Sequence, residues 1–340
     1  SMTSLSDEAT RLDRDDPLSD FRECFWIPPH EDGQQAYFCG HSLGLQPRQA
    51  EAALLAEIDA WRERAVAGHF RGDPPWMSYN EQLKEGLTAL LGALTEEIVV
   101  MNTLTVNLHL MMVSFYRPQG ERRKILIEKS AFPSDRYAVT SQLRWHGLAP
   151  GDCLVEVGEG NGAMVEESEI EDILDRHRDE ITLVLWPGVQ YISGQAFDLE
   201  RITAAAHRAG ALVGFDLAHA AGNVPLKLHD SGADFAAWCH YKYLNGGPGA
   251  IAGAFVHRRH HQPGLQRLEG WWGNDPASRF RMAPEFRAAN GADAWQLSTP
   301  PLFSMAPLTA SLELFRQAGF DQLRHKSIAM TAWLEKQVNS

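Results

Sequence analysis

The sequence predicts an α/β protein built on a doubly wound, mostly parallel sheet. Short apolar runs alternate with amphipathic helical segments between about residues 98 and 256, as in strands joined by crossover helices. Hydrophobic residues make up 44% of the 340 positions and charged residues 22%. This usage is typical of globular domains and argues against disordered, collagen-like and coiled-coil chains.

Local signals predict the elements in chain order. Residues 17–45 are irregular, and Pro47 then opens a helix that runs to about Arg64. The segment Asn102–Thr105 is expected to supply N-cap side chains for the helix that follows it. Further helices are expected over 79–91, 106–116, 134–145, 166–177 and 199–209, and strands over 98–101, 124–127, 153–157, 182–186, 212–215, 235–239 and 250–256.

The chain length predicts two domains, or one large domain with an appendage. We expect residues 1–68 to form an N-terminal arm and helix, residues 69–301 the large α/β domain, and residues 302–340 the start of a C-terminal part of the small domain. The last segment reads as two helices without a strand to pair or a core to close. We therefore expect a further C-terminal portion beyond Ser340.

Charge and hydropathy exclude several partners. The 31 Lys and Arg against 44 Asp and Glu give a net charge of −13, which repels a phosphate backbone. The basic run His257–His261 reads as a solvated turn rather than a nucleic-acid patch, because no aromatic residues alternate with it. No apolar run reaches the roughly 18 residues that a membrane span needs. We expect no nucleic-acid partner and no membrane.

The cysteines and the N-terminus indicate a cytoplasmic location. Cys24, Cys39, Cys153 and Cys239 show no metal-like spacing, so reduced thiols are expected. The first residues are acidic and polar, unlike a secretory signal.

Asp216 is the first candidate for chemistry. It follows the apolar run Leu212–Phe215, and open α/β sheets place their ligands at the carboxyl ends of strands. A buried carboxylate there needs a metal, a cationic ligand or a hydrogen-bond network. The alternative is a structural Asp that caps the next turn.

Lys242 is the second candidate. It is expected to end the buried strand that begins with the apolar run Phe235–Cys239, and it leads into a glycine-rich turn. A partly buried lysine has the lowered pKa that Schiff-base chemistry requires. The alternative is a surface lysine. An aldehyde cofactor with a pyridine ring needs an amine, an acid for the ring nitrogen and donors for a phosphate. The segment Asn102–Thr105 offers phosphate donors at a helix start, although the same residues also suit ordinary helix capping. Phe132 offers a ring that could stack on the pyridine, although taken alone it would be expected in the hydrophobic core.

Six motifs together make the sequence recognisable: Ser42–Pro47, Phe132–Asp135, Gly214–Ala220, Tyr241–Asn245, Gly270–Gly273 and Leu297–Pro301. With them the chain resembles the pyridoxal-phosphate enzymes of the aspartate-aminotransferase fold (fold type I), and within these the kynureninase family. The resemblance covers the chain from about Tyr37 to its end. It implies a large sheet domain and a small domain formed by the N- and C-terminal segments.

The resemblance also implies roles for site residues. Lys242 would be the Schiff-base lysine, Asp216 the partner of the pyridinium nitrogen, and Tyr241 an acid–base group. The other cofactor contacts would be Leu104, Thr105, Phe132, Pro133, Ser134, Asp135, His219, Trp271 and Thr299. Ser42, His69, Ser298 and Thr299 would border the substrate.

The implied reaction is hydrolysis of L-kynurenine to anthranilate and L-alanine in tryptophan catabolism, on the route to NAD. Thr299 favours kynurenine and His69 suits 3-hydroxykynurenine, which would give 3-hydroxyanthranilate. The resemblance implies a homodimer and a carboxylate-binding arginine beyond Ser340. Two positions depart from the family pattern: His41 stands where Asn is expected, and Pro187 where some relatives carry a phosphate-binding Ser.

Two other functions stay open at this point. A class-V aminotransferase or cysteine desulfurase shares the fold, the aspartate and the lysine, but usually carries His before the lysine where this chain has Tyr241. A metal-binding protein could use His257–His261 with Asp216 and His219, yet adjacent histidines in a turn rarely close a coordination shell. We expect no metal.

Overall fold

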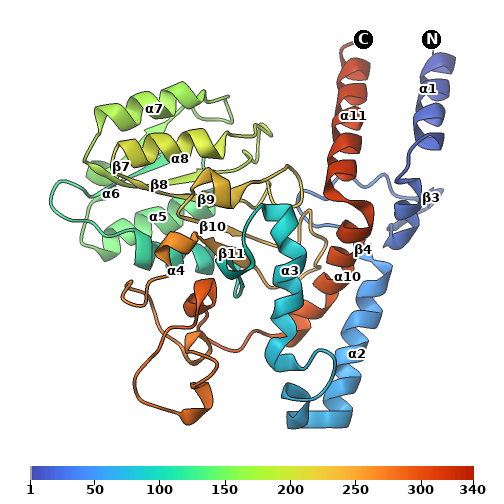
Figure 1. Cartoon of the computed structure of the whole chain (residues 1–340). Helices are drawn as coiled ribbons and strands as arrows, with labels where there is room; N and C mark the ends of the chain where they lie inside the picture. Colours follow the sequence, from blue (N-terminus) through green and yellow to red (C-terminus); the bar gives the residue numbers. More distant parts are fainter. Residues whose placement is uncertain (1) are drawn as a thin grey trace.

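A seven-stranded sheet forms the centre of the computed structural model, which describes residues 2–340 (Figure 1). The strand order is β5-β11-β10-β9-β8-β6-β7, and β11 alone runs against its neighbours. The strands are β5 (Ile98–Val100), β6 (Lys124–Glu128), β7 (Leu154–Val157), β8 (Ile181–Pro187), β9 (Leu212–Asp216), β10 (Phe235–Trp238) and β11 (Gly253–Val256). The predicted doubly wound, mostly parallel sheet is confirmed.

Helices cover both faces of this sheet, because successive side chains of each strand point to opposite sides. On one face Leu183 and Leu185 pack with α4 (Leu104–Phe115) and α5 (Pro133–Trp145). On the other face Val184 and Trp186 pack with α7 (Glu167–Arg176) and α8 (Leu199–Arg208). The two cores explain why the strands read as continuous apolar runs.

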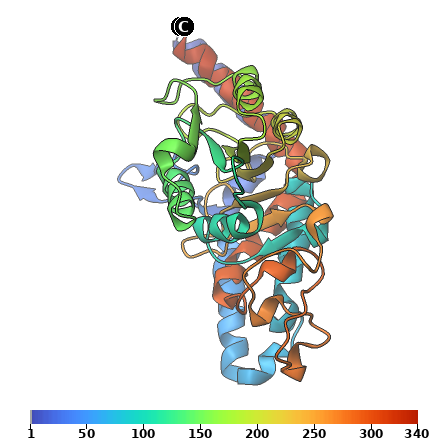
Figure 2. The same cartoon turned by 90° about the vertical axis from the view of Figure 1, so that its left-hand side faces the viewer.

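A group of long helices stands beside the sheet (Figures 1 and 2). It comprises α2 (Arg48–Arg64), α3 (Tyr79–Leu91) and α10 (Leu302–Ala318), with α10 packed against both others. At one end α11 (Phe320–Val338) is tied to the N-terminal part by ion pairs of Lys326 with Asp16 and of Lys336 with Glu8. The N- and C-terminal segments therefore lie together, while the domain boundaries at 68 and 301 stay predictions.

Short elements complete the described chain: α6 (Pro150–Cys153), α9 (Leu228–Ser231), β1 (Phe25–Trp26), β2 (Pro29–His30), β3 (Gly33–Gln34) and β4 (Gln46–Pro47). The strand β1 pairs with β4, and β2 with β3. Most predicted helices and strands appear within a few residues of their expected ends. The helix α1 (Met2–Arg14) was not predicted, because its sequence is polar and carries no strong start signal.

Two local predictions were wrong. Thr103 precedes α4, but its side chain makes no capping hydrogen bond, and Asn102 takes a left-handed conformation (φ 50°) in which its amide donates to Asn107 at 3.1 Å. The second concerns Lys242, which does not end a strand: β10 stops at Trp238, and the lysine lies in the following loop.

The basic run after β11 is more than a solvated turn. Asp234, fully buried, pairs with Arg259 and with one nitrogen each of His207 and His260. Because β11 is antiparallel, its end lies at the edge of the sheet opposite Asp216. Within this run His260 therefore binds a structural carboxylate, while His257 and His261 bond backbone carbonyls, all away from Asp216 and His219.

Within residues 2–340, no helix combines the length and the apolar character that a membrane crossing requires.

Candidate active site

A cavity of about 340 Å³ lies at the carboxyl ends of β6, β8 and β9. This is the edge at which open α/β sheets bind their ligands. Nine residues singled out from the sequence line it: Leu104, Thr105, Phe132, Ser134, Asp135, Asp216, His219, Tyr241 and Lys242. The fold thus gathers residues from four separate parts of the chain into one site.

Lys242 and Asp216 face this cavity from neighbouring segments. Asp216 is the last residue of β9 and is 5% exposed, and its Oδ1 accepts a hydrogen bond from the backbone N–H of Ala218 at 2.8 Å. The Nζ atom of Lys242 lies 3.2 Å from Nε2 of His219 and 5.9 Å from the centre of the Phe132 ring. An amine, a carboxylate and an exposed ring face therefore share one space.

Burial controls the protonation of the groups around the lysine. It lowers the pKa of His219 to about 4, and the Lys242 charge acts in the same direction, so the imidazole is neutral at pH 7. Burial also raises the pKa of Asp135 well above its usual value, helped by the neighbouring Asp216. Oδ1 of Asp135 is buried and has no hydrogen-bond partner within residues 2–340. Two carboxyl groups thus lie at the cavity, and that of Asp135 holds its proton more tightly than a free carboxyl does.

The N-terminus of α4 has the features of an anion site. No side chain caps this helix, so its first backbone N–H groups are free to bind a phosphate, and the helix dipole favours negative charge there. The hydroxyls of Thr105 and Ser134 lie beside it, 2.8 Å apart. The failed capping prediction and the phosphate prediction thus concern one feature, since a side-chain cap would use the N–H groups that a phosphate needs.

These residues fit pyridoxal phosphate. Lys242 would supply the amine, Asp216 a buried acid for the ring nitrogen, and the start of α4 with Thr105 and Ser134 the donors for the phosphate. The ring of Phe132 is 45% exposed beside the lysine and can cover one face of the pyridine. Pro133 begins α5 between Phe132 and Ser134, but does not itself line the cavity.

The N-terminal segment reaches the lysine loop. The backbone N–H of Gly44 donates to the carbonyl of Tyr241 at 2.9 Å, and the side chain of Asn245 donates to the carbonyl of Leu45 at 3.0 Å. The segment that follows Ser42 therefore contacts the lysine loop, although Ser42 itself does not line the cavity. Burial, with the neighbouring Cys239, raises the pKa of Tyr241 to about 12, so its hydroxyl keeps its proton.

Besides Pro133 and Ser42, four more predicted contacts lie outside the cavity: His69, Trp271, Ser298 and Thr299. His69 and Trp271 belong to one exposed aromatic group, since Phe70 beside His69 packs 6.0 Å from Phe280, which packs 5.4 Å from Trp271. Ser298 and Thr299 are exposed. The single chain does not bring these residues to Lys242.

Sequence reasoning missed several lining residues, among them Glu128, Gln190 and Tyr191. Glu128 ends β6 as Asp216 ends β9, so the signal that identified Asp216 was also present there. Tyr191 packs edge-on against Phe132 at 5.1 Å. Pro187 also lines the cavity, where it offers no side-chain hydroxyl.

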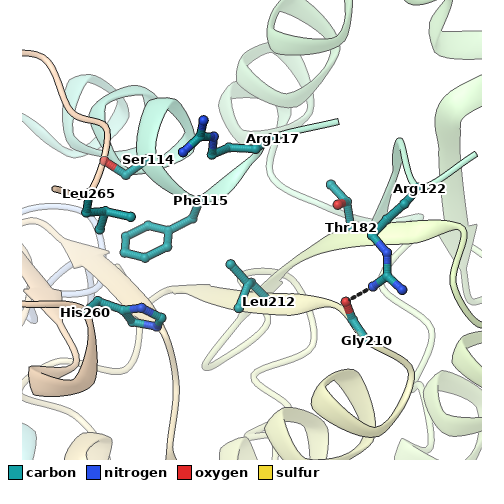
Figure 3. A pocket seen from close by; sticks show the side chains of 9 residues that line it. All are labelled: Ser114, Phe115, Arg117, Arg122, Thr182, Gly210, Leu212, His260 and Leu265. Carbon is teal, nitrogen blue, oxygen red and sulfur yellow. Dashed lines mark hydrogen bonds between the residues drawn. The ribbon is translucent and has the colours of Figure 1, made fainter. Parts of the chain in front are cut away.

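A second cavity, of about 280 Å³, lies near the starts of β8 and β9 (Figure 3). Phe115, Leu212 and Leu265 line it together with polar residues that include Arg117 and Arg122. Arg122 donates to the carbonyl of Gly210 and pairs with Asp179. Since this cavity holds neither a lysine nor a carboxylate, the chemistry predicted from the sequence belongs to the first one.

A second group of ionisable side chains lies at the same edge of the sheet as the second cavity. It consists of Glu97, His229 and His257. Their ligand-type atoms lie within 4.8 Å of one another. One oxygen of Glu97 accepts from His229 at 2.7 Å and from the backbone of Arg258 at 3.0 Å, and the other from the backbone of Leu94 at 3.0 Å. The two imidazoles stack nearly parallel, at 12°. These contacts make the group a structural tie between three segments.

Comparison with known proteins identifies the family. The chain is 56% identical over 335 residues to a kynureninase of Stenotrophomonas maltophilia, covering 98% of this chain and 79% of that one. It is 54% identical over 334 residues to a kynureninase of Xanthomonas euvesicatoria, with the same two coverages. The chain belongs to the kynureninase family. The class-V aminotransferase family matches residues 75–340, so the chain belongs to that broader family as well.

Solved structures agree on the fold. A cysteine desulfurase of Escherichia coli superposes with a TM-score of 0.74 at 18% identity, covering 95% of this chain and 77% of that one. A C–S lyase mutant with glycine covalently linked to its pyridoxal-phosphate cofactor superposes with a TM-score of 0.73 at 19% identity, covering 87% and 75%. The fold-type-I architecture expected of the kynureninase family is confirmed.

Proposed function

We propose that this protein hydrolyses the Cβ–Cγ bond of L-kynurenine, releasing anthranilate and L-alanine, with pyridoxal phosphate bound at the cavity around Lys242. The observation that carries the proposal is the presence of Lys242, Asp216 and the uncapped start of α4 around one cavity, in a chain of the kynureninase family. Kynurenine is the preferred substrate, with 3-hydroxykynurenine as the second.

Pyridoxal phosphate, when bound, supplies an aldehyde that bonds to amines and a ring that takes up electron density from Cα. Lys242 holds the cofactor and, once free, removes the Cα proton of the substrate. Asp216, buried at the end of β9, keeps the ring nitrogen protonated. Thr105, Ser134 and the start of α4 bind the phosphate.

Tyr241 is the acid–base group that we propose for the hydrolytic step. Water adds to the γ-carbonyl carbon of the substrate, the Cβ–Cγ bond breaks, and anthranilate leaves. Such a step needs a group that holds a proton beside the carbonyl oxygen. Tyr241 lines the cavity next to Lys242 and, with a pKa of about 12, keeps its proton at neutral pH.

The residues around the lysine favour this reaction over cysteine desulfuration. A desulfurase needs a reactive thiolate on a mobile loop. Cys153 and Cys239 are buried, and burial raises the pKa of Cys239. Cys24 and Cys39 lie in the N-terminal segment, and neither lines the cavity.

A homodimer and a cytoplasmic location are part of the same proposal. His69, Trp271, Ser298 and Thr299 would complete the site of a second copy rather than their own. The exposed aromatic group supports this, because Phe70 is 63% exposed, Phe280 51% and Trp271 43%. Sedimentation of the protein, with and without a Trp271→Ala substitution, tests the assembly.

The first experiment is a visible spectrum of the protein with pyridoxal phosphate, before and after addition of L-kynurenine. We expect the cofactor band to change on addition and to return as anthranilate fluorescence accumulates. A band that does not respond to kynurenine would contradict the proposed substrate. Sulfide release from cysteine without kynurenine turnover would favour the desulfurase. The same assay with 3-hydroxykynurenine measures the substrate preference.

Tyr241→Phe separates two roles of the tyrosine. We expect slower turnover with the cofactor still bound. If the variant instead loses only cofactor affinity, Tyr241 is a phosphate ligand and not an acid–base group.

A further inference from the structure

Three side chains form a hydrogen-bonded chain that leads away from the lysine. Nζ of Lys242 lies 3.2 Å from Nε2 of His219, and Nδ1 of the same imidazole lies 3.2 Å from the hydroxyl oxygen of Tyr243. The two contacts use opposite nitrogens of the ring. Within residues 2–340, His219 is the one hydrogen-bond partner of the Lys242 amine.

The imidazole is suited to pass a proton rather than store one. Because burial lowers its pKa to about 4, His219 is neutral at pH 7 and carries one N–H and one free lone pair. Such a ring accepts a proton at one nitrogen while it releases a proton from the other. Its backbone is fixed, since Asn223 donates to the His219 carbonyl at 2.9 Å.

Tyr243 completes the chain toward solvent. Its ring meets the imidazole edge-on, with centroids 5.9 Å apart at 75°. The side chain is partly exposed. Burial raises the pKa of Tyr243, so its hydroxyl keeps a proton and both donates and accepts.

We propose that His219 and Tyr243 form a proton relay between Lys242 and solvent. An N–H bond of the Lys242 ammonium breaks and that proton bonds to Nε2 of His219. The N–H bond at Nδ1 breaks and its proton passes to the Tyr243 oxygen, whose own O–H proton goes to water. One proton leaves the lysine, the imidazole changes tautomer, and the reverse sequence returns a proton.

The other ionisable groups near the lysine do not offer this route. Asp216 accepts from the Ala218 N–H and is reserved for the ring nitrogen, and burial raises the pKa of Asp135, so it holds its proton. Cys239 and Tyr241 also have raised pKa values, for which burial is the main cause. His41, from the N-terminal segment, also lowers the pKa of His219 by charge repulsion, so it too favours the neutral imidazole.

The relay gives Tyr243 a role in the reaction, and that role rests on the proposed function. Lys242 takes the Cα proton of the substrate. With a relay this proton exchanges with water before alanine is released, and without one it stays on the lysine and returns. Tyr243 acts through His219 and is therefore a positioning residue.

The first test reads the imidazole itself and needs no substrate. The holoenzyme is labelled with ¹⁵N-histidine and saturated with the product L-alanine, whose amine displaces that of Lys242 from the cofactor, and His219 is assigned by comparison with a His219→Gln variant. We expect the ¹⁵N chemical shifts of both ring nitrogens of His219 to lie between the values of a protonated and an unprotonated nitrogen, because the relay requires both tautomers. In Tyr243→Phe, which keeps the ring but loses the hydroxyl, we expect one tautomer. A single fixed tautomer in the unmodified protein would overturn the relay.

The second test follows the proton through turnover. L-Kynurenine deuterated at Cα is converted in ordinary water, and the deuterium in the alanine product is measured by mass spectrometry. We expect the retained fraction to rise at least about threefold in Tyr243→Phe, as a positioned proton-transfer group contributes well above that factor. Tyr137→Phe, on an exposed side chain of α5, is the matched control. Equal retention in all three proteins would contradict the relay, whereas no alanine at all would contradict the proposed function and leave the ¹⁵N result standing.

Discussion

Gly44 and Lys242 touch so closely that residue 44 has no room for a side chain. A Cβ atom at this position would lie 2.3 Å from the carbonyl oxygen of Lys242 and 2.5 Å from the side-chain nitrogen of Asn245. The backbone N–H of Gly44 also donates to Tyr241 at 2.9 Å. The N-terminal segment is thereby fixed against the loop that holds the lysine.

Gly44→Ala should weaken cofactor binding, because the added methyl must push the lysine loop away from the cavity. Such overpacking costs about 1–3 kcal/mol, so we expect affinity for pyridoxal phosphate to fall roughly tenfold or more. Titration of the protein with the cofactor, followed by absorption, measures this. Gly40→Ala is the control, since a Cβ there meets nothing within 4 Å. Equal affinity in the two variants would mean that the contact does not position Lys242.

Lys242→Ala should remove both turnover and the covalent attachment of the cofactor, because no other lysine lines the cavity. Borohydride reduction followed by mass spectrometry should find the cofactor on residue 242 of the unmodified protein and nowhere in the variant. Lys129→Ala, which removes an exposed lysine outside the cavity, should behave like the unmodified protein. Near-normal turnover of Lys242→Ala would end the assignment.

Asp234→Asn should destabilise the fold near neutral pH. Burial acts to raise the pKa of Asp234, but hydrogen bonds from His207, His260 and Arg259 hold it well below its usual 3.8. Its contribution to stability is therefore present above pH 3.8 and is lost as the pH falls through the lower folded-state pKa. Breaking such a buried pair costs about 3–5 kcal/mol.

Urea denaturation of Asp234→Asn at a series of pH values measures this loss. The difference from the unmodified protein should be greatest near pH 7 and should shrink below pH 3.8. Asp230→Asn, at an exposed position in α9, should show no such difference. An unchanged free energy of unfolding at pH 7 would show that the Asp234 network adds no net stability.

Glu128→Gln should stabilise the fold above pH 7. Burial raises the pKa of Glu128 from 4.5 to about 7, against a smaller opposing effect of the Gln190 side chain, and both of its oxygens are buried without a well-formed hydrogen bond within residues 2–340. The folded state therefore binds this proton more tightly than the unfolded state, and stability is lost as the pH rises from about 4.5 to about 7. A neutral glutamine avoids that loss.

Thermal melting curves of Glu128→Gln at pH 4 and pH 8 test this. We expect a gain of a few degrees at the higher pH and little change at the lower one. Glu121→Gln, on the surface, controls for the loss of one negative charge. A lower melting temperature for Glu128→Gln at pH 8 would show that the carboxylate has a stabilising partner in the folded protein.

The sequence determined the sheet, because each strand is an apolar run and each crossover helix carries apolar residues at helical spacing. It also identified Asp216, which ends β9, Phe132 and Thr105, which lie at helix starts, and Lys242, which lies in the loop after β10. These signals are local, and the motifs that carry the family resemblance contain them.

The tertiary structure decided which of these residues meet. Local sequence could not show that Thr103 leaves α4 uncapped, that Glu128 is buried at the same cavity, or that Tyr243 reaches Lys242 through His219. Nor could it show that His260 binds Asp234, or that His69 and Trp271 lie away from their own chain's lysine. Contacts of this kind join residues far apart in the chain, and they depend on strand order and burial, which local periodicity does not contain.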